Sequence, residues 1–180
     1  MRFVILDRDG VINLDSPDYI RTPDEWHAVP GSIEAIAALS RAGYEVIVAT
    51  NQSGLGRGLF GLDELEAMHQ KLRTLVEACD GRVGGIFYCP HRPEEHCACR
   101  KPATGLLDAA EREYGCPVAG STLIGDSMKD IELARAKACH PVLVLTGNGT
   151  QTQAQLGADD TDVRVFADLA AAAAALLETG

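Results

Sequence analysis

The sequence has no long run of apolar residues and no recognisable export signal. No segment approaches the ~18 consecutive apolar residues that a membrane-spanning helix requires. The opening residues, Met1–Asp7, carry an apolar stretch too short for a signal peptide and no cleavage site of small residues. We therefore expect a cytoplasmic protein that has no membrane partner.

Positive charge is also scarce. The chain has 16 Lys and Arg residues against 26 Asp and Glu residues, which gives a net charge of −10. A field of this sign repels DNA, RNA and anionic lipid, so we expect no nucleic-acid partner. A small phosphate compound could still bind where a few local donors or a metal ion offset the negative charge.

The length and composition are those of one globular domain. The chain has 180 residues, of which 46% are hydrophobic and 23% are charged, as in soluble domains with a sizeable core. No internal repeat is visible, and the alanine-rich segment Ala170–Ala175 is typical of a C-terminal helix. We expect a monomer with a single domain over residues 1–180.

Apolar strands alternate with amphipathic helices along the chain. Continuous Val, Ile and Leu runs predict buried strands at 3–6, 44–49, 85–88, 122–124 and 142–145, and a short edge strand at 163–166. Apolar strands that are each followed by a helix are typical of parallel sheets covered on both faces. The sequence therefore predicts an α/β fold of three layers, with a mostly parallel Rossmann-like sheet and helices on both of its faces.

Capping residues predict where the helices begin and end. Ser32 is expected to cap a helix that Gly43 ends. Asp63 and Glu66 form a candidate capping box for the next helix. Five apolar residues are predicted to form the inward face of that helix: Leu65, Met68, Leu72, Leu75 and Val76. A further helix is expected near Met128–Ala138.

Polar residues follow three of the predicted strands, at Asp7–Gly10, Thr50–Gly54 and Gly125–Asp130. Taken singly, such patterns are typical of turns and helix caps. In a parallel sheet, however, the carboxyl ends of the strands meet at one edge, where ligands bind. Carboxylates gathered there repel one another unless a cation lies between them, and oxygen ligands favour Mg²⁺. Thr50 and Lys101 could supply donors to a phosphate bound to that metal.

These segments resemble, in order, the four motifs of haloacid dehalogenase-like phosphatases. The matching residues are Asp7–Val11, Thr50–Asn51, Lys101 and Gly125–Asp130. The resemblance spans nearly the whole chain. It implies supporting roles for Ser127 and for Asp130, which would orient Lys101.

The resemblance also implies the roles of the other residues. Asp7 would be the nucleophile that takes the phosphoryl group, and Asp9 would be the general acid and base. Asp7, the backbone carbonyl of Asp9, and Asp126 would hold Mg²⁺. Thr50 and Lys101 would stabilise the charge of the transferring phosphoryl group.

Three of the six cysteines crowd around a histidine within eleven residues: Cys89, His91, Cys97 and Cys99. Three thiolates and one imidazole fit tetrahedral Zn²⁺ with no open position, which favours a structural zinc site. Free cysteines, or His96 as the fourth ligand, are the alternatives. The loop has little apolar surface, so zinc would replace a missing core and hold the adjoining Arg100 and Lys101 in place.

The same loop narrows the resemblance. Its Cys-x-His…Cys-x-Cys-Arg-Lys-Pro pattern is similar to that of D-glycero-D-manno-heptose 1,7-bisphosphate 7-phosphatases and the related histidinol-phosphate phosphatases. This likeness implies that Arg100 recognises the substrate. It also implies substrate contacts from two short segments, Asp15, Ser16, Asp18 and Tyr19, and Asn51, Gln52 and Ser53.

No large cap domain fits between the predicted strands. The zinc loop at 89–99 and the loop at 15–26 would then cover the cleft. Tyr19 and Trp26 could line that cleft, although single aromatic residues more often pack in a core.

The leading hypothesis is a Mg²⁺-dependent phosphatase that removes the 7-phosphate of the heptose bisphosphate, in the biosynthesis of nucleotide-activated heptose for lipopolysaccharide. A histidinol-phosphate phosphatase, with the same chemistry on another leaving group, is the alternative. A third hypothesis is a non-catalytic phosphoaccepting receiver or metal-binding interaction module, which would need neither Asp9 nor the zinc loop. The expected partner is a small sugar phosphate, and the expected cofactors are Mg²⁺ and Zn²⁺.

Overall fold

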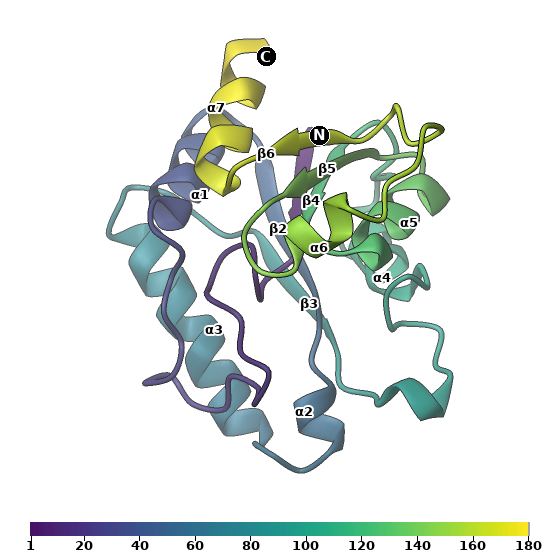
Figure 1. Cartoon of the computed structure of the whole chain (residues 1–180). Coiled ribbons are helices and arrows are strands. Elements are labelled where there is room, and N and C mark those ends of the chain that lie inside the picture. The colour runs from purple at the N-terminus through teal and green to yellow at the C-terminus, as the bar shows by residue number, and fades with distance from the viewer. Residues whose placement is uncertain (180) are drawn as a thin grey trace.

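Six parallel strands form one sheet in the computed structural model, which describes residues 1–179. Their order across the sheet is β3-β2-β1-β4-β5-β6 (Figure 1). The strands are β1 (Phe3–Leu6), β2 (Glu45–Asn51), β3 (Gly85–Cys89), β4 (Thr122–Gly125), β5 (His140–Val144) and β6 (Arg164–Phe166). Each predicted strand is present, and the predicted parallel sheet is confirmed.

Helices connect the strands. They are α1 (Ser32–Arg41), α2 (Ser53–Gly56), α3 (Leu62–Glu77), α4 (Gly105–Tyr114), α5 (Met128–Ala136), α6 (Gly149–Gln153) and α7 (Leu169–Thr179), with a single 3-10 turn at Pro93–Glu95. The C-terminal helix and the helix after β4 are confirmed, whereas α2, α4 and α6 have no counterpart among the helices expected from sequence. Within residues 1–179, no helix has the length and apolar character needed to cross a membrane.

The helices cover both faces of the sheet, which gives the three predicted layers (Figure 1). Helices α1, α3 and α7 pack on the face that carries Val4 and Leu6. Helices α4 and α5 pack on the opposite face, which carries Phe3 and Ile5. Successive side chains of a strand point to opposite faces, so β1 contributes to both cores and all four of its residues are buried and apolar.

The register of the sheet brings the ends of its central strands together. Leu6, the last residue of β1, pairs with Val48 of β2 and with Ile124 of β4. The next residue, Asp7, donates its backbone N–H to the Ile124 carbonyl at 2.9 Å. The polar residues that end these strands therefore meet at the carboxyl edge of the sheet.

The start of α1 differs from the prediction. Ser32 is the first residue of the helix, and the cap is Gly31, which has a left-handed conformation with φ 81°. The Ser32 hydroxyl donates instead to the buried carbonyl of Ile12 at 2.7 Å. Its side chain thus satisfies a loop carbonyl from elsewhere in the chain, which a local capping rule does not detect. The predicted end is confirmed, because Gly43 follows the helix with φ 87°.

Helix α3 begins one residue before Asp63, and the predicted capping box of Asp63 with Glu66 is wrong. The Glu64 carboxylate accepts the backbone N–H of Gly61 at 2.9 Å instead. Four of the five predicted inward residues are buried, but Leu75 is 37% exposed. Its position in the helical repeat lies at the margin of the apolar stripe, which explains the difference.

The loop between β1 and α1 is anchored to the core by Trp26. This side chain is completely buried, so of the two alternatives for Trp26, packing is confirmed. Lys71 of α3 donates to the carbonyls of Pro23 and Trp26 at 2.6 and 2.8 Å. In the part of the chain that the structure describes, loops of this kind flank the carboxyl edge of the sheet, and there is no separate cap domain, as predicted.

Candidate active site

A cavity of about 240 Å³ opens at the carboxyl edge of the sheet, beyond β1, β2 and β4. Twelve of the predicted site residues line it: Asp7, Asp9, Asp15, Ser16, Tyr19, Asn51, Gln52, Ser53, Arg100, Lys101, Asp126 and Ser127. Thr50 and Asp130 are buried, each 1% exposed, behind residues that line the cavity. Asp18 lies outside this cavity and lines a neighbouring surface hollow, so its predicted contact with substrate has no support in this arrangement.

Lys101 lies between two aspartates at the base of the cavity. Its Nζ is 2.8 Å from Oδ1 of Asp7 and 2.7 Å from Oδ1 of Asp130. Burial acts to lower the pKa of Lys101, but the charges of Asp130 and Asp7 outweigh it and raise that pKa above its ordinary value. Burial also raises the pKa of Asp7 well above its usual range, although Lys101 opposes this. The predicted orientation of Lys101 by Asp130 is consistent with this geometry.

Asp126 is fixed by residues that follow β5. Its Oδ2 accepts the backbone N–H of Asn148 at 2.8 Å and the side-chain amide of the same residue at 3.1 Å. The Thr152 hydroxyl donates to its backbone carbonyl at 2.7 Å. Burial raises the pKa of Asp126 to about 6, despite these donors. A positive charge close to this carboxylate would stabilise its ionised form and lower its pKa.

Two glycines make room beside Asp126. Gly10 and Gly147 have φ values of +83° and +57°, in the left-handed region that favours glycine. A Cβ atom added to either residue would lie 2.2 Å from Oδ2 of Asp126. Only residues without a side chain therefore let these two loops close around the carboxylate.

Three carboxylates could hold a divalent cation. Asp7, Asp126 and Asp130 each bring one oxygen within 4.8 Å of the others. Asp130 is already engaged, because its Oδ1 accepts from Lys101 and its Oδ2 accepts from the N–H and hydroxyl of Ser127 at 3.2 and 2.7 Å. Asp7 and Asp126 are therefore the carboxylates best placed to face a cation.

Asp9 is held as a carboxylate by three side chains. Arg8 makes a salt bridge to it at 2.8 Å, and the amides of Asn13 and Gln52 donate at 2.9 and 2.8 Å. Burial would raise the pKa of Asp9, but the Arg8 charge and these hydrogen bonds outweigh it and lower that pKa. Asp7 and Asp9 thus lie two residues apart with opposite pKa shifts: burial and the neighbouring carboxylates raise the pKa of Asp7, whereas Arg8 and the amide donors lower that of Asp9.

Side chains at the end of β2 do more than line the cavity, because that of Asn51 also holds the backbone of Lys101. The side-chain oxygen of Asn51 accepts the backbone N–H of Lys101 at 2.9 Å, and its amide donates to the Lys101 carbonyl at 3.2 Å. Gln52 donates to the Thr50 hydroxyl at 2.9 Å as well as to Asp9. Ser53 begins α2 and lines the cavity.

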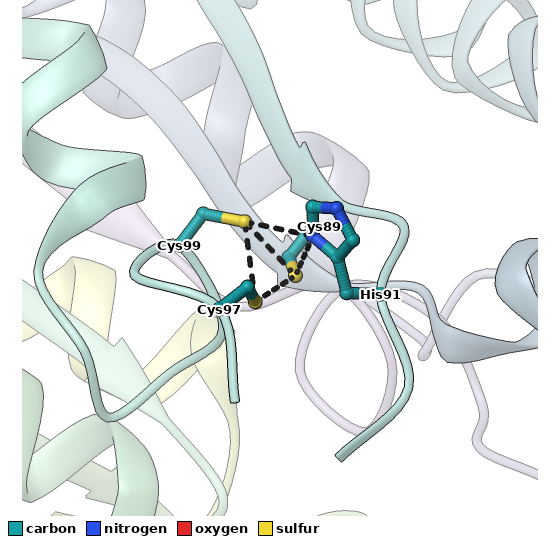
Figure 2. A group of neighbouring side chains, drawn as sticks. All are labelled: Cys89, His91, Cys97 and Cys99. Carbon is teal, nitrogen blue, oxygen red and sulfur yellow. Dashed lines mark hydrogen bonds between the residues drawn. The ribbon is translucent and has the colours of Figure 1, made fainter. Parts of the chain in front are cut away.

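Four side chains converge at the end of β3: Cys89, His91, Cys97 and Cys99 (Figure 2). The sulfur atoms lie 3.2–3.5 Å apart, and Nδ1 of the histidine lies 3.2 and 3.6 Å from two of them. No disulfide links them, since all six cysteines are free. Ligand atoms about 2.0–2.3 Å from one zinc ion would be roughly 3.5 Å apart, so the cluster has the size of a tetrahedral site.

The cluster is joined directly to the cavity. The backbone N–H of Arg100 donates to Sγ of Cys97 at 3.3 Å, and its guanidinium donates to the His91 carbonyl at 3.4 Å. His96, the alternative fourth ligand, is exposed and lies outside the group of four. The segment that carries Arg100 and Lys101 is therefore fixed on one side by this cluster and on the other by Asn51.

Several known proteins are similar to this chain in sequence and in structure. Residues 98–172 match the profile of a family described as "HAD-hyrolase-like". The chain is 55% identical over 175 residues to the D-glycero-beta-D-manno-heptose-1,7-bisphosphate 7-phosphatase of Pseudomonas aeruginosa, with 97% of each chain covered. It is 48% identical over 178 residues to the enzyme of the same name from Bordetella bronchiseptica, with 99% of each covered.

A crystal structure of the B. bronchiseptica D,D-heptose 1,7-bisphosphate phosphatase, complexed with magnesium and phosphate, superimposes with a TM-score of 0.95 at 47% identity and covers 100% of both chains. The chain belongs to the haloacid dehalogenase-like family of heptose bisphosphate phosphatases. The resemblance seen in the four motifs is thereby confirmed, as is the Rossmann-like fold. As a member of this phosphatase family the chain is a phosphoric monoester hydrolase, which sets aside the non-catalytic receiver hypothesis.

Four residues that contact Asp9 or Asp126 were not predicted: Arg8, Asn13, Asn148 and Thr152. The last two follow β5, and the rule applied to the ends of the other strands would have pointed to them. Arg8 lies within the first motif and Asn13 lies two residues after it, but both residue types are ordinary on protein surfaces. Their contacts with Asp9 depend on how the chain turns after β1, which the sequence pattern does not specify.

The position of Lys101 generates a prediction about stability. Lys101→Met leaves Asp7 and Asp130 buried with no cation between them, so in magnesium-free buffer at neutral pH we expect the free energy of unfolding to fall by about 3–5 kcal/mol. Without Lys101 the pKa of Asp7 rises further, so the loss should shrink as the pH falls and Asp7 takes up a proton. Urea unfolding at several pH values measures this.

The matched control is Lys137→Met. The ammonium of Lys137 contacts Asp108 and Glu111 near the surface at 2.9 and 2.6 Å. A pair of this kind contributes at most about 1 kcal/mol. Equal losses of stability in the two variants, or a loss for Lys101→Met that does not change with pH, would contradict the account.

Proposed function

We propose that this phosphatase hydrolyses the 7-phosphate of D-glycero-D-manno-heptose 1,7-bisphosphate with Mg²⁺ as cofactor, on the route to the nucleotide-activated heptose of lipopolysaccharide. The observation that carries the proposal is the meeting of Asp7, Asp126 and Lys101 in one cavity. The names of relatives that are 48–55% identical over nearly the whole chain support the choice of substrate.

Asp7 is the nucleophile. Its Oδ1 accepts from Nζ of Lys101 at 2.8 Å and from the backbone N–H of Arg8 at 2.7 Å, and these contacts fix the carboxylate. Both contacts use Oδ1, so Oδ2 attacks phosphorus. The new oxygen–phosphorus bond forms while the bond from phosphorus to the sugar oxygen breaks, which leaves an aspartyl phosphate.

Asp9 moves the protons. Arg8, Asn13 and Gln52 favour its carboxylate form, so the protonated form that gives a proton to the departing sugar oxygen is the minor one in the free site. Asp9 then takes a proton from the water molecule that attacks the phosphorus of the aspartyl phosphate. The bond between Asp7 and phosphorus breaks, inorganic phosphate is released, and both aspartates return to their starting states.

The residues present fit a magnesium ion. Asp7, the backbone carbonyl of Asp9, and Asp126 would hold it, because buried carboxylates with raised pKa values mark a place where negative charge lacks compensation. When bound, Mg²⁺ supplies positive charge that offsets the carboxylates and the phosphate oxygens. Lys101 and Thr50 stabilise the remaining charge on the phosphoryl group.

Substrate recognition involves Arg100 and the loop at Asp15–Tyr19. Arg100 lines the cavity on the side of the cysteine cluster, where its charge suits the second phosphate of a bisphosphate. On the opposite side, the Asn148 amide contacts Asp15 at 3.4 Å as well as Asp126 at 3.1 Å. This shared amide links the position of the substrate loop to that of the metal ligand.

A structural zinc ion on Cys89, His91, Cys97 and Cys99 is part of the proposal. The donor set and the spacing of the four side chains fit it, and no position remains open for substrate. Zinc would hold Arg100 and Lys101 at the cavity. We also infer a cytoplasmic monomer built as one domain; the free state of all six thiols supports a reducing compartment.

Asp9→Asn tests the catalytic assignment. The amide can neither give a proton to the leaving oxygen nor accept one from water, so we expect turnover of a sugar phosphate to fall by a factor of about 10²–10⁴. Asp7 remains able to attack, and rapid quenching with ³²P-labelled substrate should trap a phosphorylated protein. Asp7→Asn should give neither turnover nor trapped label. Unchanged phosphate release by Asp9→Asn would show that its role is assigned wrongly.

The substrate assignment predicts a preference for two phosphates over one. We expect kcat/KM for the heptose bisphosphate to exceed that for histidinol phosphate by at least ~100-fold. Arg100→Gln should reduce this preference by about 10–100-fold, the loss expected when one charge-assisted contact is removed. A preference of the unaltered chain for histidinol phosphate would defeat the heptose assignment.

The zinc site predicts a local effect of metal removal. A zinc-selective chelator, added with Mg²⁺ in excess, should disorder residues 89–101 and slow turnover at least ~10-fold, because second-sphere support of a site typically has that effect. Amide hydrogen exchange, circular dichroism and activity would be followed together. Cys99→Ser should lose zinc, and Cys116→Ser should keep it. Loss of all helical signal together with zinc would contradict a local role.

A further inference from the structure

Arg8 is a buried charge that the mechanism above does not use. Its side chain is 0% exposed, although arginine is rarely buried unless its charge is paired. It lies between the proposed nucleophile and the proposed acid–base residue in the sequence. A buried guanidinium needs an anionic partner, and its place beside these two residues suggests a role in the site.

The partner of Arg8 is Asp9. Nε and Nη2 of the guanidinium donate to Oδ1 of Asp9 at 3.0 and 2.8 Å, and Nη2 is also 3.2 Å from Oδ2. Asn13 donates to the same Oδ1 at 2.9 Å. Three hydrogen bonds therefore reach Oδ1, whereas Oδ2 accepts two, from Gln52 at 2.8 Å and the longer one from Nη2 at 3.2 Å. This asymmetry leaves Oδ2 as the oxygen that exchanges a proton.

His69 supports the other end of the guanidinium. Nε2 of this residue lies 3.5 Å from Nη1 of Arg8, and the ring is 2% exposed on the inner face of α3. Burial, together with the charge of Arg8, lowers the pKa of His69 to about 3, so the imidazole is neutral at physiological pH. Arginine can only donate, so Nε2 is the acceptor. The ring also lies against Tyr88 with centroids 5.9 Å apart.

We propose that Arg8, supported by His69, is the positioning residue for Asp9. The planar guanidinium fixes one oxygen of the carboxylate and thereby aims the other at the leaving oxygen. The chain of contacts runs from α3 through His69 and Arg8 to Asp9. The inference rests on the proposed function, because it assigns how Asp9 is held for proton transfer.

Leaving groups of different basicity test this role. A sugar phosphate needs a proton on its departing oxygen, whereas p-nitrophenyl phosphate does not. In Arg8→Lys the charge remains but the planar fork is lost, so kcat/KM for heptose bisphosphate should fall about 10–100-fold, part of the usual contribution of general acid catalysis. kcat/KM for p-nitrophenyl phosphate should fall less than ~3-fold, because its leaving group needs little proton donation. This ratio reports the steps up to phosphorylation of Asp7 and so excludes the later hydrolysis step, in which Asp9 acts as a base for both substrates. Equal losses on both substrates, or no loss, would overturn the proposal.

Variants of His69 keep the test decisive if Arg8→Lys does not fold. His69→Leu removes the acceptor and should give the same selective loss, whereas His69→Gln offers an amide oxygen and should restore activity on the sugar phosphate. Failure of His69→Gln to differ from His69→Leu would overturn the proposal. Arg73→Gln, one turn along α3 and paired with Glu66 at 3.0 Å, is the control and should leave both activities unchanged.

The same measurements separate this inference from the proposed function. If the unaltered chain hydrolyses p-nitrophenyl phosphate but no sugar phosphate, the proposed function is overturned and the inference falls with it. If it hydrolyses both and Arg8→Lys affects them equally, only the positioning role is overturned.

Discussion

One buried ammonium between two carboxylates is the interaction on which this site depends. Lys101 lies within 2.8 Å of both Asp7 and Asp130, and all three groups are largely removed from water. Carboxylates this close would repel one another without a cation, and Asp126 adds a further negative charge beside them. Lys101 offsets part of the negative charge at this edge of the sheet. The negative charge that remains on the carboxylates would attract a divalent cation.

Much of the structure around the cavity serves to place that lysine. The side chain of Asn51, at the end of β2, forms two hydrogen bonds with the Lys101 backbone. The cysteine cluster at the end of β3 holds the preceding residue, Arg100. Lys101 therefore occupies a fixed point although it lies in a loop with little regular structure of its own. A second set of contacts, from Arg8, Asn13 and Gln52, fixes Asp9 independently.

The sequence could predict the elements that repeat a local pattern. The strands were predicted because buried parallel strands are continuously apolar, and the site because polar residues follow those strands. The cysteine cluster was predicted from spacing alone. Two details that were wrong or missed depend on partners distant in sequence: Ser32 bonds a loop carbonyl instead of capping its helix, and Asn148 contacts Asp126. Arg8 is visible in the first motif, but the sequence does not predict that its side chain is buried.

The central claim is that Asp7, Asp126 and Lys101 surround one phosphoryl group together with a magnesium ion. A crystal structure of this protein grown with Mg²⁺ and beryllium fluoride tests it most directly, because beryllium fluoride mimics a phosphoryl group attached to an aspartate. The account predicts beryllium bonded to a carboxylate oxygen of Asp7, Nζ of Lys101 next to one of its fluorine atoms, and a metal ion between Asp7 and Asp126. The mimic bound at another residue, or a metal ion outside this group, would contradict it.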